Sequence, residues 1–175
     1  NYVKLFTKDK EFWTSLRVTI VFALMTVPGK IILALAVAIF LNRDIKGINL
    51  IRTLYYIPSL FGGSVAIAIL WRLMFLDNGP INAVLNAMGL QTVKFLGSTT
   101  WALPTICLLE IWQFGSSMVM FLAALKNVPK SLYEAAEIDG AKKIDRFWHI
   151  TLPQISPIIF FTVLNQTIQA LQNFT

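Results

Sequence analysis

The chain has 175 residues and a net charge of +6, and only 14% of its residues are charged, with a mean hydropathy of +0.65. Soluble domains carry nearer ~25% charged residues, and here the apolar residues come in long blocks, which favours a membrane protein. The positive charge does not indicate nucleic-acid binding, because no basic stripe is interleaved with aromatic residues and many Lys and Arg lie at block edges. The single cysteine, Cys107, excludes an intramolecular disulfide.

Four apolar blocks predict transmembrane helices, since a span needs roughly 20 apolar residues. They cover residues 12–41, 53–75, 101–125 and 155–175. The expected fold class is therefore an all-α, polytopic transmembrane helical bundle forming one domain. Pro28-Gly29 predicts a kink or loosening in the first block. The chain starts without Met and stops inside the fourth block, so we expect it to be a piece of a longer chain, truncated at both ends.

Residues 80–89, between the second and third blocks, have the pattern of a short amphipathic helix. Pro80 suits a first helical turn, the apolar residues recur at helical spacing, and Gly89 can end the helix. We expect this helix to lie at the outer membrane surface. An ordinary surface helix packed on the spans is the alternative.

The basic residues of the connections predict the topology. Lys and Arg number three in residues 42–52, five in 126–152 and one in 77–100. The positive-inside rule places the first two connections in the cytoplasm and the third outside. The polar lead-in must then be outside, where its three lysines are a mild conflict.

The one long polar segment, residues 131–153, is predicted to form two short helices. Ser131 followed by Glu134 predicts a capping box, and Gly140 suits the left-handed residue after a helix end. A second helical stretch is expected over 141–149. Ala135, Ala136 and Gly140 carry almost no side chain, so the backbone of another protein could approach closely. A solvated helix pair without a partner is the alternative.

This segment resembles a known motif. Glu134-Ala135-Ala136, Asp139-Gly140-Ala141 and Ile150-Thr151-Leu152-Pro153 resemble the EAA loop of membrane subunits of binding-protein-dependent ABC importers. The motif sequence is most similar to that of the sugar-uptake branch of these importers, of the maltose and multiple-sugar type.

The resemblance implies the ABC importer permease fold and a bacterial cytoplasmic membrane location. It also implies that the loop is a coupling helix that docks into a cytoplasmic ATPase subunit, and that the ATPase binds ATP so that this chain needs no cofactor. A second, similar permease subunit and an extracytoplasmic solute-binding protein are the other implied partners. The coupling residues carried over by the motif are Glu134, Ala135, Ala136, Asp139, Gly140, Ile150, Leu152 and Pro153.

No enzyme site is found in the sequence. The only histidine is His149, no Cys/His cluster could hold a metal, and no GxxxxGK[ST] phosphate loop occurs. Hydrolysis of ATP would have to come from a separate subunit.

The last apolar block carries a stripe of polar residues along one side. Its members are Thr162, Asn165, Gln166, Gln169, Gln172 and Asn173. Amides donate and accept hydrogen bonds without net charge, which suits hydroxyl-rich neutral ligands such as sugars. We therefore assign Asn165, Gln169, Gln172 and Asn173 to a substrate path. Helix–helix hydrogen bonding, worth about 0.6 kcal/mol per bond, is the alternative.

Lys30 and Glu110 are the two charges in the middle of apolar blocks. An isolated charge there costs roughly 2.5–3.5 kcal/mol, so we expect the two to pair or each to face a wet cavity. Glu110 and nearby Gln113 are further candidates for the path. Tryptophans at the span ends could stack on sugars or anchor the helices at the interface.

These features predict a permease subunit of an ATP-driven ABC importer for a sugar or polyol. Three alternatives stay open: an ABC permease for a non-sugar solute, an ATP-independent secondary transporter or channel in which Lys30 and Glu110 serve ion coupling, and a membrane scaffold without transport.

Overall fold

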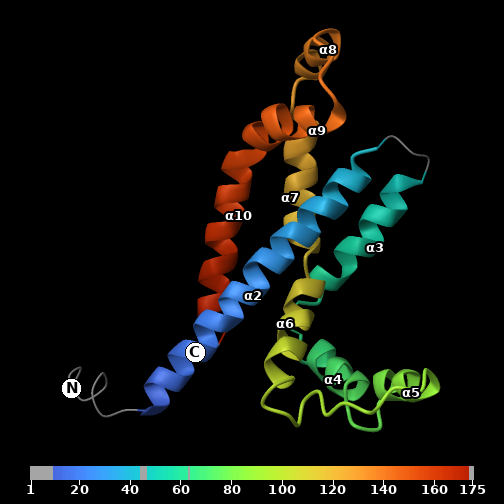
Figure 1. Ribbon diagram of the computed structural model, residues 1–175, viewed down its shortest axis with the longest axis vertical. Coiled ribbons are helices and arrows are strands. Elements are labelled where there is room, and N and C mark those ends of the chain that lie inside the picture. Colours follow the sequence, from blue (N-terminus) through green and yellow to red (C-terminus); the bar gives the residue numbers. More distant parts are fainter. Residues whose placement is uncertain (1–9, 44–46, 63, 174–175) are drawn as a thin grey trace.

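The computed structural model describes residues 10–43, 47–62 and 64–173, and every regular element in them is a helix. Figure 1 shows a shaft of longer helices with short helices at both ends: α8 and α9 at one, α4 and α5 at the other. The all-α prediction is confirmed.

Helix α2 (Lys10–Leu41) is the centre of the shaft and packs against α6, α7 and α10. Ala34 and Ala38 are completely buried, and such small side chains let neighbouring helices approach closely. Pro28 lies inside α2, yet the helix runs through it, so the kink expected there does not interrupt the helix.

The second apolar block, predicted as one span over residues 53–75, is built from two helices. It forms α3 (Ile48–Leu60) and α4 (Val65–Met74), whose axes differ by 98°. Ser64 starts α4 anew, since its hydroxyl accepts a hydrogen bond from the Ala66 amide. At the other end, α3 begins earlier than expected, and Arg52 donates from Nη2 to the Leu41 carbonyl, 2.7 Å away, at the end of α2. This contact ties α3 to α2.

The third block is also bent. Helices α6 (Ala102–Trp112) and α7 (Gly115–Lys126) meet at 43°. Gly115 lies against α3, where a Cβ atom would come 2.6 Å from the Tyr55 carbonyl oxygen. The break in this block falls just before Gly115, and Pro104 is accommodated in the first turn of α6.

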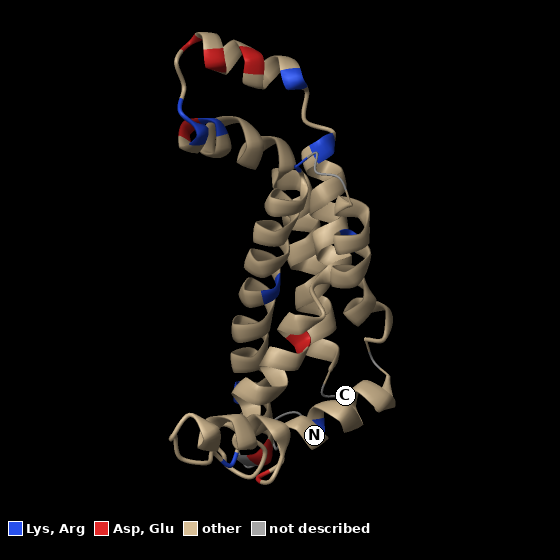
Figure 2. Cartoon of the chain, turned by 90° about the vertical axis from the view of Figure 1, so that its right-hand side faces the viewer, with Lys and Arg blue, Asp and Glu red and all other residues tan. Residues whose placement is uncertain are grey.

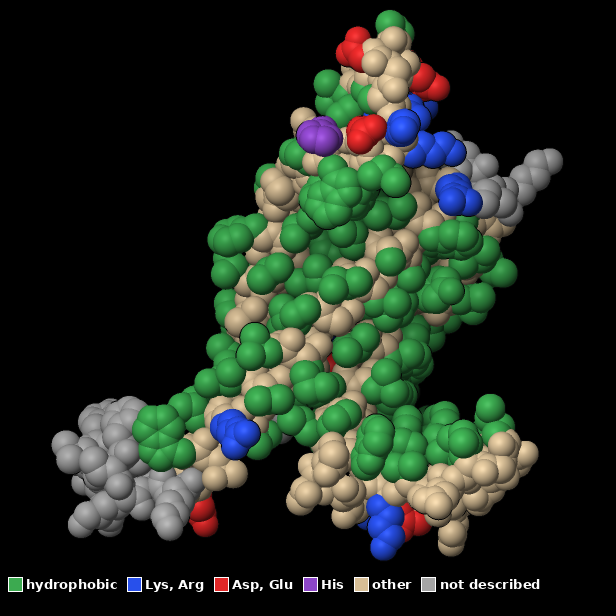
Figure 3. Space-filling view, in the orientation of Figure 1, with side chains coloured by type: hydrophobic (Ala, Val, Ile, Leu, Met, Phe, Trp, Pro, Cys, Tyr) green, Lys and Arg blue, Asp and Glu red, His purple; other side chains and the backbone are tan. Residues whose placement is uncertain are grey.

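Helix α5 (Pro80–Ala87) begins at Pro80 and is followed by Gly89 with φ of 75°, as the sequence predicted. Asn82 fixes this end of the molecule. Its side chain is buried, donates to the carbonyls of Leu76 and Val93 and accepts from the Val93 amide. Figure 3 shows apolar side chains on the side of this lobe that faces the shaft and charged ones on its far side. That distribution suits an amphipathic surface helix.

The polar segment forms α8 (Lys130–Ile138), α9 (Lys143–Arg146) and the π-helical turn η1 (Phe147–Thr151), and α10 (Leu152–Gln172) follows. The run from Lys143 to Gln172 has no break, so the second helical stretch is continuous with the last span rather than separate from it. In Figure 1 the chain changes direction between α9 and α10, where η1 lies. Such π-turns are a common cause of bends.

In the described part of the chain, two helices are long and apolar enough to cross a membrane alone, Glu11–Leu41 and Lys143–Gln172. The number rises to four if each bent pair is one span. Large apolar side chains such as Leu24, Ile32 and Phe160 are exposed on the shaft. Figure 2 shows the charged residues gathered mainly at the two ends. An apolar belt between charged ends is what a lipid bilayer requires.

Candidate substrate path and coupling loop

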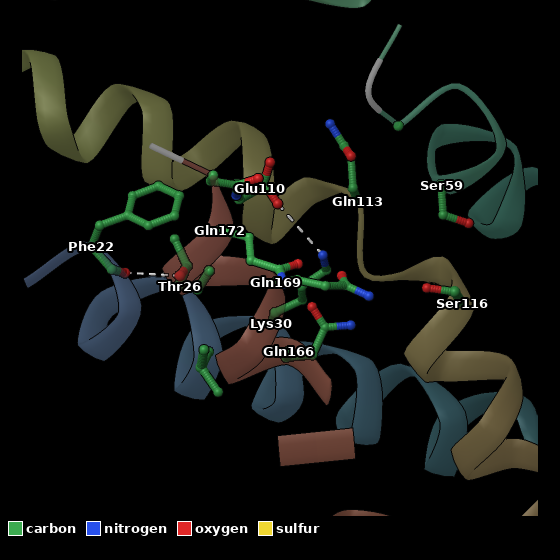
Figure 4. A pocket seen from close by; sticks show the side chains of 14 residues that line it. Phe22, Thr26, Lys30, Ser59, Glu110, Gln113, Ser116, Gln166, Gln169 and Gln172 are labelled. Carbon is green, nitrogen blue, oxygen red and sulfur yellow. Dashed lines mark hydrogen bonds and ion pairs between the residues drawn. The ribbon is translucent and has the colours of Figure 1, made fainter. Parts of the chain in front are cut away.

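A cavity of about 330 Å³ lies between α2, α6 and α10, beside the breaks in the second and third blocks (Figure 4). Hydroxyls, amides and one charge of each sign dominate its wall. The lining residues are Phe22, Thr26, Val27, Lys30, Ser59, Gly62, Glu110, Gln113, Ser116, Gln166, Gln169, Ala170, Gln172 and Asn173. In the described residues, no three His, Cys, Asp or Glu side chains come together as a metal site requires.

The cavity brings Lys30 of α2 and Glu110 of α6 together. The Lys30 Nζ atom lies 3.6 Å from Glu110 Oε2, and the two side chains are 9% and 27% exposed. Figure 4 shows the pair reaching across the cavity from different helices. The separation exceeds the roughly 2.7–2.9 Å of a charge-assisted hydrogen bond, so the two groups attract each other without a tight bond. Pairing and exposure to a polar cavity, the two options weighed from the sequence, therefore occur together.

The amide stripe of α10 divides between the cavity and the protein. Gln166, Gln169, Gln172 and Asn173 line the cavity. Gln166 is buried and donates from Nε2 to the Ser117 hydroxyl on α7, 3.1 Å away, so it also joins two helices. Gln166 thus forms the helix–helix hydrogen bond that was the alternative, while it and the other three residues line the cavity; their assignment to a substrate path stays a prediction.

Asn165 does not line the cavity, although the sequence pattern assigned it to the path. It is exposed, and its Oδ1 accepts from Gln169 Nε2 at 3.5 Å. Each residue turns an α-helix by about 100°, so the neighbour of a residue that faces inward points elsewhere. Thr162 is buried and donates to the Ile158 carbonyl within α10.

Three hydroxyl residues of the cavity were not predicted: Thr26, Ser59 and Ser116. Thr26 precedes Lys30 by four residues, so helical spacing alone could have placed it on the same face. Ser59 and Ser116 lie beside the α3–α4 and α6–α7 breaks. These two breaks are brought together by tertiary packing, which the sequence pattern does not reveal.

The tryptophans considered for sugar stacking lie in an aromatic cluster and do not line this cavity. Trp71 donates from Nε1 to the Thr105 carbonyl, 3.1 Å away, and its ring packs on those of Phe75 and Trp112. Trp101 contacts Phe95. Their position gives no support to sugar stacking in this cavity.

The start of the polar segment, residues 131–153, differs from the prediction. Helix α8 begins at Lys130, one residue before Ser131, and Pro129 precedes it without a side-chain cap. The capping box predicted for Ser131 and Glu134 is therefore wrong, because Ser131 already lies in the first turn. The corresponding contact occurs at α9, where the Asp145 carboxylate accepts from the Lys142 amide at 3.1 Å.

The rest of the segment is braced and largely exposed. The Tyr133 and Thr151 hydroxyls lie 2.8 Å apart, and Arg146 Nη1 donates to Glu137 Oε2 at 3.1 Å. Gly140 has φ of 76°, the left-handed conformation that was predicted. Among the motif residues, the structure exposes Glu134, Ala135, Asp139, Gly140 and Pro153, and half-buries Ala136, Ile150 and Leu152.

The sequence matches the family described as "Binding-protein-dependent transport system inner membrane component" over residues 9–175. The chain belongs to this family. It is 49% identical over its whole length to the probable ABC transporter permease protein YesP of Bacillus subtilis, covering 57% of that protein. It is 36% identical to the lactose transport system permease protein LacF of Rhizobium radiobacter, with 99% of the chain and 59% of the relative covered.

A third relative is the trehalose/maltose transport system permease protein MalF of Thermococcus litoralis, 35% identical over 99% of the chain and 59% of its own length. Among solved structures, a bacterial ABC transporter involved in the import of the acidic polysaccharide alginate matches with a TM-score of 0.84 and 27% identity. That match covers 98% of the chain and 61% of the other. The predicted ABC importer permease fold is thereby confirmed, and the chain spans a little over half the length of the relatives it matches.

Proposed function

We propose that this chain forms part of the transmembrane path of an ATP-driven importer for a sugar or related polyol. The observation that carries the proposal is the polar cavity between α2, α6 and α10, inside a shaft whose outer surface is apolar. Polar groups at membrane depth cost free energy and need a reason, and a path for a polar solute is such a reason.

The wall chemistry favours sugars over other solutes. Gln169 and Gln172 from α10 and Gln113 from the α6–α7 break supply amides that both donate and accept, and the hydroxyls of Thr26 and Ser59 add to them. The volume lies within the range of small-molecule sites, about 300–1,000 Å³. The names of relatives that transport lactose and trehalose or maltose support the same solute class.

The coupling role belongs to residues 131–153, which we place in the cytoplasm against a separate ATPase subunit that binds ATP. Ile138 and Ile144 are 87% and 71% exposed, although this end of the molecule is its most highly charged part. Apolar side chains in such a setting favour a protein partner. Figure 1 shows the segment at the same end as the last turn of α2 and the first turn of α3, which flank the other connection assigned to the cytoplasm.

The bracing contacts suggest how a movement of the ATPase reaches the solute. The Tyr133–Thr151 contact joins α8 to η1, and η1 continues into α10. A displacement of α8 is therefore passed to the helix that carries Gln166 and Gln169. By the family resemblance, a second permease subunit completes the path and a solute-binding protein delivers the sugar from outside.

The test is ATP-dependent uptake of radiolabelled maltose, trehalose and lactose into vesicles that contain the complete importer and its binding protein. Gln172→Leu removes an amide of the cavity wall and should lower uptake of the transported sugar at least tenfold. Thr167→Val is the control, because it removes a polar group of the same helix that lies outside the cavity and bonds only to the Val163 carbonyl, and uptake should stay within twofold of wild type. Equal losses in both variants would contradict this path, and uptake driven by an ion gradient without ATP would contradict the importer.

A further inference from the structure

We propose that the Lys30–Glu110 pair makes this path selective for uncharged sugars, with Glu110 as the residue that excludes anionic ones. The inference rests on the proposed function, since it assigns the charge class of the solute that the same cavity accepts.

The first support is the charge of the cavity wall. Of the 14 lining residues, which all belong to the described part of the chain, Lys30 and Glu110 alone carry a formal charge. One positive and one negative charge give a net charge of zero. The remaining wall offers amides, hydroxyls, glycine and apolar groups, none of which discriminates strongly between a neutral solute and an anion.

The second support is the unequal exposure of the two charges. The Glu110 side chain is 27% exposed and that of Lys30 is 9% exposed, so a solute in the cavity meets the carboxylate more readily than the ammonium group. The Nζ–Oε2 separation of 3.6 Å leaves carboxylate lone pairs available to accept hydrogen bonds from sugar hydroxyls. Lys30, the less exposed of the two, compensates the charge of Glu110.

An anionic sugar finds no such complement. Its carboxylate or sulfonate would approach Glu110, and charges of equal sign repel strongly at short distance in a weakly solvated site. If Glu110 became neutral, Lys30 would remain as an uncompensated, largely buried cation, and a bound anion would restore neutrality. The same side-chain change should therefore weaken the exclusion of anions and create an attraction for them.

The solved relatives show that this fold serves charged solutes as well. One of them imports the acidic polysaccharide alginate, whereas the names of other relatives refer to lactose and to trehalose or maltose. Within the membrane path, selection by charge therefore depends on individual side chains rather than on the helix arrangement.

The experiment measures binding to the complete transporter without its binding protein, because the binding protein would select the sugar first. Equilibrium dialysis would compare radiolabelled maltose, lactose and trehalose with their counterparts in which one C6 hydroxymethyl group is oxidised to a carboxylate. We expect the wild type to bind the neutral member of at least one pair tenfold or more tightly than the acid. Glu110→Gln should lower this ratio at least tenfold, to parity or to a preference for the acid.

Two further variants separate charge from shape. Glu110→Asp keeps the negative charge and should keep the wild-type ratio. The double variant Lys30→Met/Glu110→Gln removes both charges and should bring the ratio near one; it also supplies the test if Glu110→Gln alone fails to assemble. A ratio that stays at the wild-type value in the neutralised variants would overturn the inference, as would a wild type that prefers the acids. If an intact, ATP-hydrolysing wild type binds neither member of any pair, the sugar path itself fails and this inference falls with it.

Discussion

The interior of the shaft and the coupling segment each contain an ion pair, and the two pairs have opposite geometries. Lys30 and Glu110 are 3.6 Å apart with side chains 9% and 27% exposed, whereas Arg146 and Glu137 are 3.1 Å apart with side chains 19% and 73% exposed. The shorter contact is thus the better solvated one. Water screens exposed charges, whereas a buried charge that loses its partner is left without compensation. We therefore expect the Lys30–Glu110 contact to be the more costly to break, although it is the longer one.

The largest expected effect is on the buried pair. Glu110→Leu leaves the ammonium group of Lys30 uncompensated inside the shaft, which should lower the free energy of unfolding by about 3 kcal/mol or prevent assembly. Lys30→Met should cost less, because the Glu110 carboxylate is partly exposed to the cavity. The double variant Lys30→Met/Glu110→Leu should recover most of the loss. Thermal unfolding of the detergent-purified complex measures all three.

If the double variant is no more stable than Glu110→Leu alone, the two charges do not depend on each other and the comparison above fails. Assembly can be followed separately by size-exclusion chromatography, which distinguishes a folded but destabilised complex from one that never forms.

The next effect contrasts a glycine of the shaft with one of the coupling segment. A Cβ at Gly115 would lie 2.6 Å from the Tyr55 carbonyl oxygen and 2.9 Å from the Tyr56 Cα, whereas a Cβ at Gly140 would meet nothing within 4 Å. Gly115→Ala should therefore destabilise the complex by about 2 kcal/mol through overpacking. Gly140→Leu should cost only about 1 kcal/mol, because its φ of 76° disfavours other residues.

In an assay of coupling between uptake and ATP hydrolysis, Gly140→Leu should have a larger effect than Gly115→Ala. Under the proposed docking to an ATPase, the bulky side chain of Gly140→Leu separates uptake from ATP hydrolysis, so uptake falls at least tenfold while hydrolysis continues. Gly97→Ala, at an exposed turn where a Cβ has only a Lys94 contact at 3.8 Å, is the control for both assays. Normal uptake in Gly140→Leu would count against the coupling role.

The same contrast explains what the sequence could predict. The coupling segment is built from short-range contacts, so its helices and the left-handed Gly140 followed from local residue patterns. Its first cap was misplaced because a one-residue shift at Lys130 moved Ser131 into the helix. The cavity is built from distant segments. Lys30 and Glu110 could be linked because charges are rare in apolar blocks, whereas a common hydroxyl such as Ser59 carried no comparable signal.

The helix breaks mark the limit of prediction from composition. Residues 53–75 are apolar enough for one span, yet they turn by 98° between α3 and α4. Gly62, at this turn, leaves room for Gln113 from the α6–α7 break, since a Cβ there would lie 2.6 Å from Gln113 Oε1. Whether Gly62 marks a bend or only permits close packing depends on Gln113, a residue far away in the sequence.

The smallest expected effect is on the exposed pair of the coupling segment. Glu137→Gln removes the negative charge but keeps a side chain of similar shape, and the free energy of unfolding should fall by about 0.5 kcal/mol or less. Salt should weaken the native pair, so the difference between wild type and variant should vanish near 1 M NaCl, where the screening length is roughly 3 Å. The difference caused by Glu110→Leu should persist at the same salt concentration, because screening acts mainly on solvated charges. Parallel thermal melts at low and high salt would therefore rank the two pairs directly, and a salt-insensitive Glu137→Gln effect as large as that of Glu110→Leu would reverse the ranking.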